Sequence, residues 1–297
     1  MPLATIDHVL VGVRDLDAAV PVYETLLGRS AGLRGHHPDY GTGNAIFQLE
    51  NSYLELVAPE GEGAFADALR ARLEAGGEGI VGLALGTNDA AALSAEWRAQ
   101  GLRASTPRPG EGHGPGGVRR WRNVDVPAED VAGLFLFAIE HLSDASSRPV
   151  AAAQGEAAAT LHALDHVVVH TPDAEAAISL FRDRMGIRLA LDRDAPQWGA
   201  RMLFFRLGGI TLEVIQRYAE SGAPATAEAG PSRFWGLALR ARDVAAARAR
   251  LAAAGVDVSE VRKGRKPGTR VCTVRNGTCG VPTLIIGPDP NAGSEGS

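Results

Sequence analysis

Residues 6–17, which read IDHVLVGVRDLD, and residues 164–175, which read LDHVVVHTPDAE, decide the fold of this chain. Each stretch opens with an apolar, β-branched run that is typical of a β-strand. An aspartate then stands where sequence of helical character begins. A carboxylate is favoured there because it accepts hydrogen bonds from the first backbone N–H groups of a helix, which lack partners within the helix. The two stretches therefore predict that a strand–helix unit is repeated.

The same pattern occurs four times along the 297 residues. We expect first strands at 6–13, 80–86, 164–170 and 234–239, followed by helices that begin at Asp15, Asp89, Asp173 and Asp243. Each helix is predicted to end at a glycine, which adopts the left-handed conformation of a helix end without strain: Gly28, Gly101, Gly186 and Gly255. Further strand-like runs follow the first and third helices. The chain is thus four copies of one unit, arranged as two pairs.

A matched histidine and glutamate distinguish the first copy of each pair. Seven residues before the helix aspartate lie His8 and His166 in the first and third copies, whereas the second and fourth copies have Gly82 and Gly236. Counting forward 47 residues from each histidine gives Glu55, within YLELV, and Glu213, within TLEVI. Two coincidences of residue type and spacing indicate a shared role for these pairs.

Composition narrows the classes of function. The net charge of −5 offers no basic excess for nucleic acid, and no apolar run is long enough to cross a bilayer. The first residues lack the pattern of a secretory signal, and the two cysteines, Cys272 and Cys279, form no disulfide framework. We expect a cytoplasmic protein, monomeric or homodimeric, whose partner is a small molecule and neither nucleic acid nor membrane.

The expected domain organisation follows from the pairs and from the composition between them. An N-terminal domain is predicted at 1–142 and a C-terminal domain at 161–288. Between them, residues 143–160 are rich in Ala and Ser and read as a linker, and residues 289–297 read as a flexible tail.

A strand, a helix and three further strands, used in pairs, resemble the vicinal oxygen chelate superfamily, which includes glyoxalases, extradiol dioxygenases and bleomycin-resistance proteins. The strongest marks are DHV at 7–9 and at 165–167, each followed by a helix aspartate. Residues 37–44, HPDYGTGN, are similar to a loop of a glyoxalase-like subgroup. The resemblance implies an α+β fold of four βαβββ modules, which form two tandem glyoxalase-like domains with half-barrel clefts.

The resemblance also implies a metal site. In members of the superfamily that are enzymes, the metal is bound by residues on the first and last strands of the units, so His8 with Glu55, and His166 with Glu213, stand at ligand positions. His36 or His37 would complete the first set. These ligands suit divalent Zn, Ni, Fe, Co or Mn. The expected function is isomerase or lyase chemistry on a small oxygenated substrate in the N-terminal cleft, with Glu55 and His37 as catalytic residues.

Substrate contacts are expected from two further stretches. Thr42 and Asn44, in the loop after His37, are candidates to bind a substrate oxygen. In the predicted strand RRWR at 119–122, alternation places Arg120 and Arg122 on one face and Arg119 with Trp121 on the other. We expect Arg120, Arg122 and Trp121 to contribute to substrate binding, with an arginine holding a carboxylate.

The second and fourth copies depart from the superfamily pattern. Gly82 and Gly236 cannot bind a metal through side chains, and the last strands, at 134–139 and 282–286, offer only apolar residues and Thr283. Three alternatives therefore stay open. The chain is a metal-free module that sequesters a hydrophobic compound, or only its first domain is active, or the first and third copies pair and bring two histidines and two glutamates together.

Overall fold

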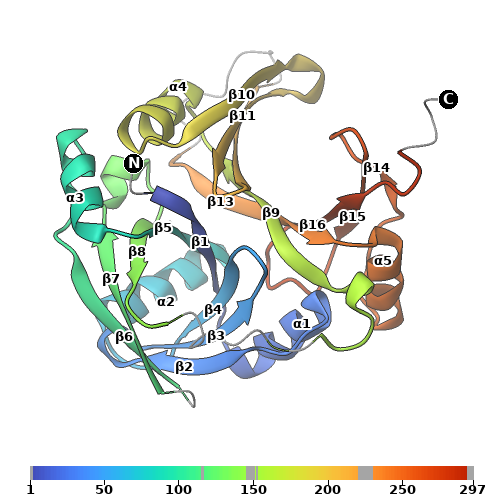
Figure 1. The fold of residues 1–297 in the computed structure, drawn as a ribbon, viewed down its shortest axis with the longest axis horizontal. Coiled ribbons are helices and arrows are strands. Elements are labelled where there is room, and N and C mark those ends of the chain that lie inside the picture. The colour runs from blue at the N-terminus through green and yellow to red at the C-terminus, as the bar shows by residue number, and fades with distance from the viewer. Residues whose placement is uncertain (1–2, 115–116, 145–150, 152, 220–229, 293–297) are drawn as a thin grey trace.

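A computed structural model describes residues 3–114, 117–144, 151, 153–219 and 230–292. The chain forms two domains, each built on an eight-stranded sheet (Figure 1). The predicted α+β fold of four βαβββ modules is confirmed. Residues 145–150 and 152 of the predicted linker, and residues 293–297 of the predicted tail, lie outside the described residues.

The first domain contains two modules joined by an additional helix. The first module comprises β1 (Leu3–Gly12), α1 (Leu16–Leu27), β2 (Leu33–His37), β3 (Thr42–Gln48) and β4 (Tyr53–Pro59). The connecting helix is α2 (Ala64–Gly76), which the sequence patterns did not predict. The second module comprises β5 (Gly79–Thr87), α3 (Ala90–Ala99), β6 (Arg108–Gly114), β7 (Gly117–Asp125) and β8 (Leu136–His141).

The helix ends form as the sequence predicts. The Asp15 carboxylate accepts hydrogen bonds from the backbone N–H groups of Asp17 and Ala18, and α1 ends at Gly28 with a φ of 70°. The Asp89, Asp173 and Asp243 side chains cap their helices in the same way. These caps fix where each module turns from strand to helix.

The first sheet closes into a barrel with the strand order β1-β4-β3-β2-β6-β7-β8-β5. Strand β1 runs parallel to β4 and antiparallel to β5. Closure takes place at a single residue pair, His36 opposite His113, between β2 and β6. The predicted half-barrel cleft is thus the interior of a closed barrel in this domain.

The second domain repeats the modules without closure. Its elements are β9 (Leu161–His170), α4 (Ala174–Ile178) with a π-helical turn (Ser179–Arg184), β10 (Arg188–Ala195), β11 (Ala200–Leu207), β12 (Ile210–Arg217), β13 (Arg233–Ala241), α5 (Val244–Ala253), β14 (Arg262–Lys263), β15 (Thr269–Val274) and β16 (Thr283–Pro288). The sheet order is β10-β11-β12-β9-β13-β16-β15-β14, with β10 and β14 as open edges. Strand β14 has only two residues, so it offers little edge for closure.

Modules pair within each domain. Strand β1 pairs with β5, and β9 pairs with β13, so the alternative in which the first and third modules exchange partners is wrong. His8 and Glu55 therefore lie in one domain, and His166 and Glu213 lie in the other.

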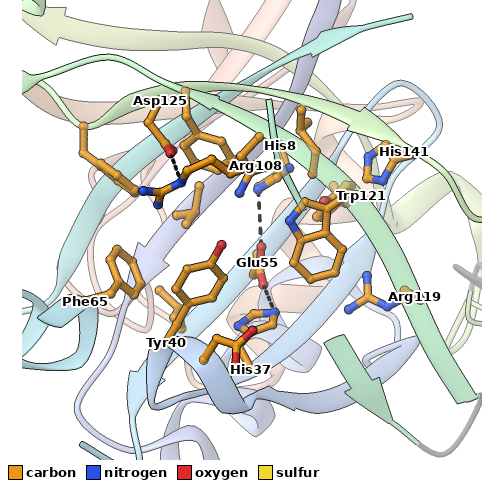
Figure 2. Close-up of a pocket in the computed structure, with 18 of the residues that line it drawn as sticks. His8, His37, Tyr40, Glu55, Phe65, Arg108, Arg119, Trp121, Asp125 and His141 are labelled. Carbon is orange, nitrogen blue, oxygen red and sulfur yellow. Dashed lines mark ion pairs between the residues drawn. The ribbon is translucent and has the colours of Figure 1, made fainter. Parts of the chain in front are cut away.

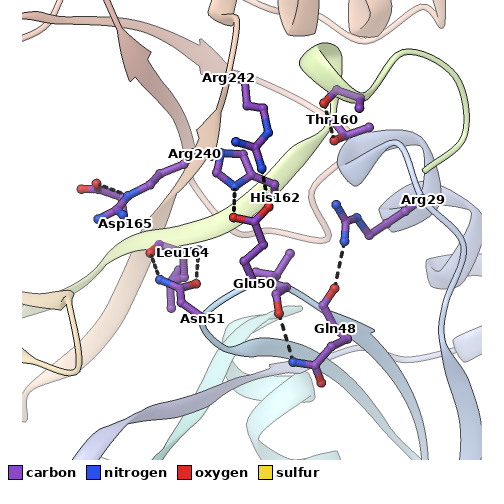
Figure 3. A network of polar contacts seen from close by, with 12 residues as sticks. Arg29, Gln48, Glu50, Asn51, Thr160, His162, Leu164, Asp165, Arg240 and Arg242 are labelled. Carbon is purple, nitrogen blue, oxygen red and sulfur yellow. Dashed lines mark hydrogen bonds and ion pairs between the residues drawn. The ribbon is translucent and has the colours of Figure 1, made fainter. Parts of the chain in front are cut away.

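The two domains share one continuous core, to which buried apolar side chains of both contribute. At the junction, the turn between β3 and β4 reaches the second domain (Figure 3). The Asn51 side chain exchanges two hydrogen bonds with the Leu164 backbone, at 2.8 and 2.9 Å, and Glu50 pairs with His162 and Arg242. In the described ranges, no helix combines the length and the apolar character needed to cross a membrane.

Arg250 on α5 makes a second contact between the domains. Its guanidinium donates to the carbonyl oxygens of Thr25 and Leu26, in the last turn of α1, and to that of Ala159. The Thr25 and Leu26 carbonyls lie in the last turn of α1, where carbonyl oxygens have no partners within the helix. Arg250 therefore satisfies acceptors that would otherwise be left unpaired.

We expect Arg250→Ala to lower the free energy of unfolding by about 3 kcal/mol, because a charged donor to three carbonyls is lost. Chemical denaturation followed by circular dichroism measures this. Arg242→Ala is the control, because Arg242 pairs with the half-exposed Glu50 at the surface and its loss should cost less than about 1 kcal/mol. Equal effects of the two substitutions would contradict the role assigned to Arg250.

Candidate active site in the N-terminal barrel

The interior of the first barrel holds a cavity of about 350 Å³ (Figure 2). One part of its wall is polar and is formed by His8 on β1, His37 at the end of β2 and Glu55 on β4. Another part is aromatic. Phe65 lies on α2, Phe137 lies on β8, and Phe135 immediately precedes β8. A polar cluster within an apolar cavity is the usual form of a small-molecule site.

Glu55 is the centre of the polar cluster and is only 7% exposed. Its Oε2 lies 3.3 Å from His8 Nε2, and its Oε1 lies 2.6 Å from Asn44 Nδ2 and 3.7 Å from His37 Nε2. Burial favours the neutral acid, but the two histidines and the donated amide bond outweigh it and hold the pKa of Glu55 below its ordinary value. Glu55 is therefore a buried carboxylate that is ionised at neutral pH.

Asp7 orients His8. The Asp7 carboxylate accepts from His8 Nδ1 at 2.8 Å and lies 3.0 Å from His141 Nε2, and these contacts hold the pKa of Asp7 well below its usual range despite its burial. The His8 ring stacks on Tyr53 at 4.3 Å between ring centres. Because Nδ1 is occupied by Asp7, His8 presents Nε2 to Glu55.

His37 is fixed in place by two polar contacts. Its Nδ1 lies 3.2 Å from the Thr42 hydroxyl, and its Nε2 lies 3.3 Å from Asn44 Nδ2, which donates to it. The ring packs edge-on against Trp121. Burial lowers the pKa of His37, partly offset by Glu55. His37, Thr42 and Asn44, three residues singled out from the sequence, are thus brought together with Glu55.

Other residues singled out from the sequence lie away from the cavity. His36 is exposed and stacks against His113 at the seam of the barrel, so the structure does not place it with Glu55. Trp121 lines the cavity, but Arg120 and Arg122 point outward, near Glu111 and Glu140. Unlike Trp121, these two arginines therefore do not line the cavity, and their expected role in substrate binding stays a prediction.

Arg119 is a cavity residue that the sequence did not lead us to assign to substrate binding. Strand alternation places it on the same face as Trp121, and both are buried and line the cavity. The signal was present, because a tryptophan in the middle of a strand marks the face that turns inward.

Aromatic side chains occupy the positions where the second module would supply a second pair of ligands. Glu55 on β4 is the pairing partner of Leu10, which lies two residues after His8 on β1. In the second module, Gly82 corresponds to His8, so Ala84 corresponds to Leu10. The pairing partner of Ala84 on β8 is Phe137, which therefore occupies the position of Glu55. At Gly82, a Cβ atom would stand 2.5 Å from the Phe135 ring. Among the described residues, no group of three or more His, Cys, Asp or Glu side chains is arranged to hold a metal ion.

The second domain keeps a looser copy of the cluster. His166 Nδ1 lies 2.9 Å from Asp165, and its Nε2 lies 3.6 Å from Glu213. Burial raises the pKa of Glu213, in contrast to Glu55, although His166 and Arg265 counteract the rise. Leu284, beside Ala238, occupies the position that matches Phe137. This pair lies on an open sheet and has no counterpart of His37 or Asn44 among its hydrogen-bond partners in the described residues.

Comparison with known proteins identifies the family. Residues 6–162 match the family described as "Glyoxalase-like domain". The chain belongs to the glyoxalase-like family. Residues 165–273 of this glyoxalase-like protein match the "Glyoxalase/Bleomycin resistance protein/Dioxygenase superfamily". Both halves therefore derive from the superfamily that the repeated DHV stretches resemble.

Individual relatives show what the chain is similar to. The ethylmalonyl-CoA/methylmalonyl-CoA epimerase of Cereibacter sphaeroides is 36% identical over 62 residues, which are 21% of this chain and 46% of that protein. The match thus spans about half the length of this curated relative.

Two solved structures cover most of the chain. A variant of 4-hydroxymandelate synthase from Streptomyces coelicolor has a TM-score of 0.70 at 16% identity, with 97% of this chain and 94% of that chain covered. The Mn(II)-bound glyoxalase from Novosphingobium aromaticivorans has a TM-score of 0.63 at 16% identity, with coverages of 96% and 82%. These likenesses establish the tandem fold.

We expect Asp7→Asn to destabilise the glyoxalase-like protein at pH 7 by about 2 kcal/mol, because two histidines lose a shared carboxylate. The pKa of Asp7 is depressed in the folded state, so its stabilising effect is complete above the ordinary carboxyl pKa and is lost as the pH falls below it. Denaturation at several pH values should therefore show the variant and the wild type converging in acid. Asp39→Asn, at an exposed position, is the control.

Proposed function

We propose that this protein is an isomerase- or lyase-type enzyme that moves a proton at a carbon next to a carbonyl, on a small oxygenated substrate bound in the N-terminal cavity. The observation that carries this proposal is the buried Glu55 carboxylate, which is ionised and lines a cavity that also has an aromatic wall. A carboxylate that is held out of water and oriented by neighbours is suited to act as a general base.

Glu55 would accept the proton from carbon, and the bonding electrons would remain on the substrate as an enolate. His8, fixed by Asp7, and His37, fixed by Thr42, flank the two oxygens of Glu55 and hold the carboxylate in place. Return of the proton from Glu55 to a neighbouring atom gives an isomer, whereas an epimer requires a second acid that delivers a proton to the opposite face of the enolate. The partial match to a protein named as an epimerase supports this class of reaction.

We also propose that a divalent metal, of the group Zn, Ni, Fe, Co and Mn, takes part. His8 Nε2 and Glu55 Oε2 stand 3.3 Å apart, a separation that suits two atoms each about 2.1 Å from one ion. The bond from His8 Nδ1 to Asp7 is the usual support of a metal-bound histidine. His37 is the third donor, provided that the Asn44 amide moves from between it and Glu55. Such an ion would polarise the substrate carbonyl.

The first test follows deuterium uptake from solvent by nuclear magnetic resonance, with aryl 2-oxo acids and 2-methyl-branched malonyl thioesters as substrates. The wild type should exchange the proton next to the carbonyl, and Glu55→Gln should slow this by about 10²- to 10⁴-fold. Glu213→Gln, the matched change in the second domain, should leave the rate unchanged. An unaltered rate in Glu55→Gln would rule out the proposed base.

The second test measures metal in protein purified without a histidine tag. We expect about one equivalent of divalent metal per chain in the wild type and its loss in both His8→Ala and Glu55→Ala. His166→Ala, at the matching position of the open sheet, should retain the wild-type content. Absence of metal from the wild type would overturn the metal proposal and leave the proton-transfer proposal to the exchange test.

One observation favours a second candidate function. The Asn44 amide already bridges Glu55 and His37, and phenylalanines fill the opposite ligand positions, so the cavity is also compatible with metal-free binding of an apolar compound. Saturable binding that EDTA does not alter, with no exchange catalysed for any substrate, would favour this function over the first.

A further inference from the structure

We infer that the natural ligand of the N-terminal cavity is a small organic acid whose single carboxylate binds Arg119. Its apolar substituent would then pack on the aromatic wall formed by Phe65, Phe135 and Phe137. The inferred reaction rests on the proposed function, because the carbon between carboxylate and substituent would face Glu55. The inferred binding mode does not depend on that reaction.

Arg119 is a buried cation without a matching anion at contact distance. It lines the cavity and is 8% exposed, and among the described residues no carboxylate lies within ion-pairing distance of it. The other arginine of the cavity, Arg108, has a partner in Asp125 at 3.0 Å. A guanidinium stays protonated even when it is buried, so a buried arginine without an anionic partner costs free energy of folding. A bound anionic ligand would remove this cost.

The position of Arg119 sets the orientation of the ligand. In Figure 2, Arg119 lies beside Trp121 on one side of Glu55, whereas Tyr40 and Phe65 lie on the other side. The guanidinium carbon is 5.9 Å from the Trp121 ring centre. A ligand that spans the cavity therefore has an anionic end, a middle that faces Glu55 and an apolar end.

The charge balance favours a carboxylate over a phosphate ester. Arg108 is paired with Asp125, so of the two arginines that line the cavity only Arg119 offers an ion pair to a ligand, and it carries one positive charge. A planar guanidinium also pairs with a carboxylate through two parallel hydrogen bonds. A monoanionic carboxylate therefore matches the single charge and the planar shape of the Arg119 guanidinium.

The test compares 3-phenylpropionate with 3-phenylpropionamide, which has nearly the same shape without the charge. Isothermal titration calorimetry on the full chain should show that the wild type binds the acid at least tenfold more tightly than the amide. Arg119→Gln should abolish this preference and leave the affinity for the amide within about twofold. Arg120→Gln removes the same charge from the outer face of the same strand, so it should retain the wild-type preference.

Equal affinities for the two compounds in the wild type, an undiminished preference in Arg119→Gln, or no binding of the acid would each overturn the inference. Thermal unfolding of ligand-free Arg119→Gln provides an independent readout. The variant should be at least as stable as the wild type, because an unpaired buried charge is removed, and a marked loss of stability would assign Arg119 a structural role instead.

Glu55→Gln separates this inference from the proposed function. It should keep the preference for the acid while it loses deuterium exchange. If the wild type catalyses deuterium exchange but binds acid and amide equally, only the inferred carboxylate site at Arg119 is overturned. If the wild type prefers the acid but catalyses no exchange, only the proposed enzymatic function is overturned.

Discussion

The burial of the Glu55 carboxylate is the constraint on which the rest of the N-terminal domain depends. An ionised carboxylate away from water is stable only if polar groups surround it. Here the Asn44 amide donates to Glu55 Oε1, and His8 and His37 lie 3.3 and 3.7 Å from its two oxygens. Asp7 holds the His8 ring, and Thr42 holds the His37 ring. The barrel holds these side chains in register, because β1, β2, β3 and β4 are neighbours in one sheet.

The two domains show how closure of the sheet changes one ancestral site. In the first, the meeting of β2 and β6 encloses the His–Glu pair, and a connecting helix adds Phe65 to the wall. In the second, the short β14 leaves the sheet open, the histidine-to-glutamate distance lengthens from 3.3 to 3.6 Å, and the pKa of Glu213 shifts upward. We therefore propose the chemistry for the first domain only, and the second domain shares its core.

The sequence predicted the fold well because its signals are local and repeated. The aspartate caps, the glycine helix ends and the spacing from His8 to Glu55 all depend on short-range rules of backbone geometry. Barrel closure and the inward face of β7 depend on contacts between strands that are distant in the sequence. The sequence alone therefore does not show that His36 lies at the seam of the barrel, or that Arg119 and not Arg120 faces the cavity. The connecting helix α2 lies between two modules and has no repeat to reveal it.

The most direct measurement of the central claim is a crystal structure of the full chain with 3-phenylpropionate bound. The ligand should lie inside the first barrel, with its carboxylate against Arg119, its methylene carbons facing Glu55 and its ring on Phe65 and Phe135. Ligand on the open sheet beside His166, or a carboxylate turned toward Arg108 with Arg119 unoccupied, would contradict the account.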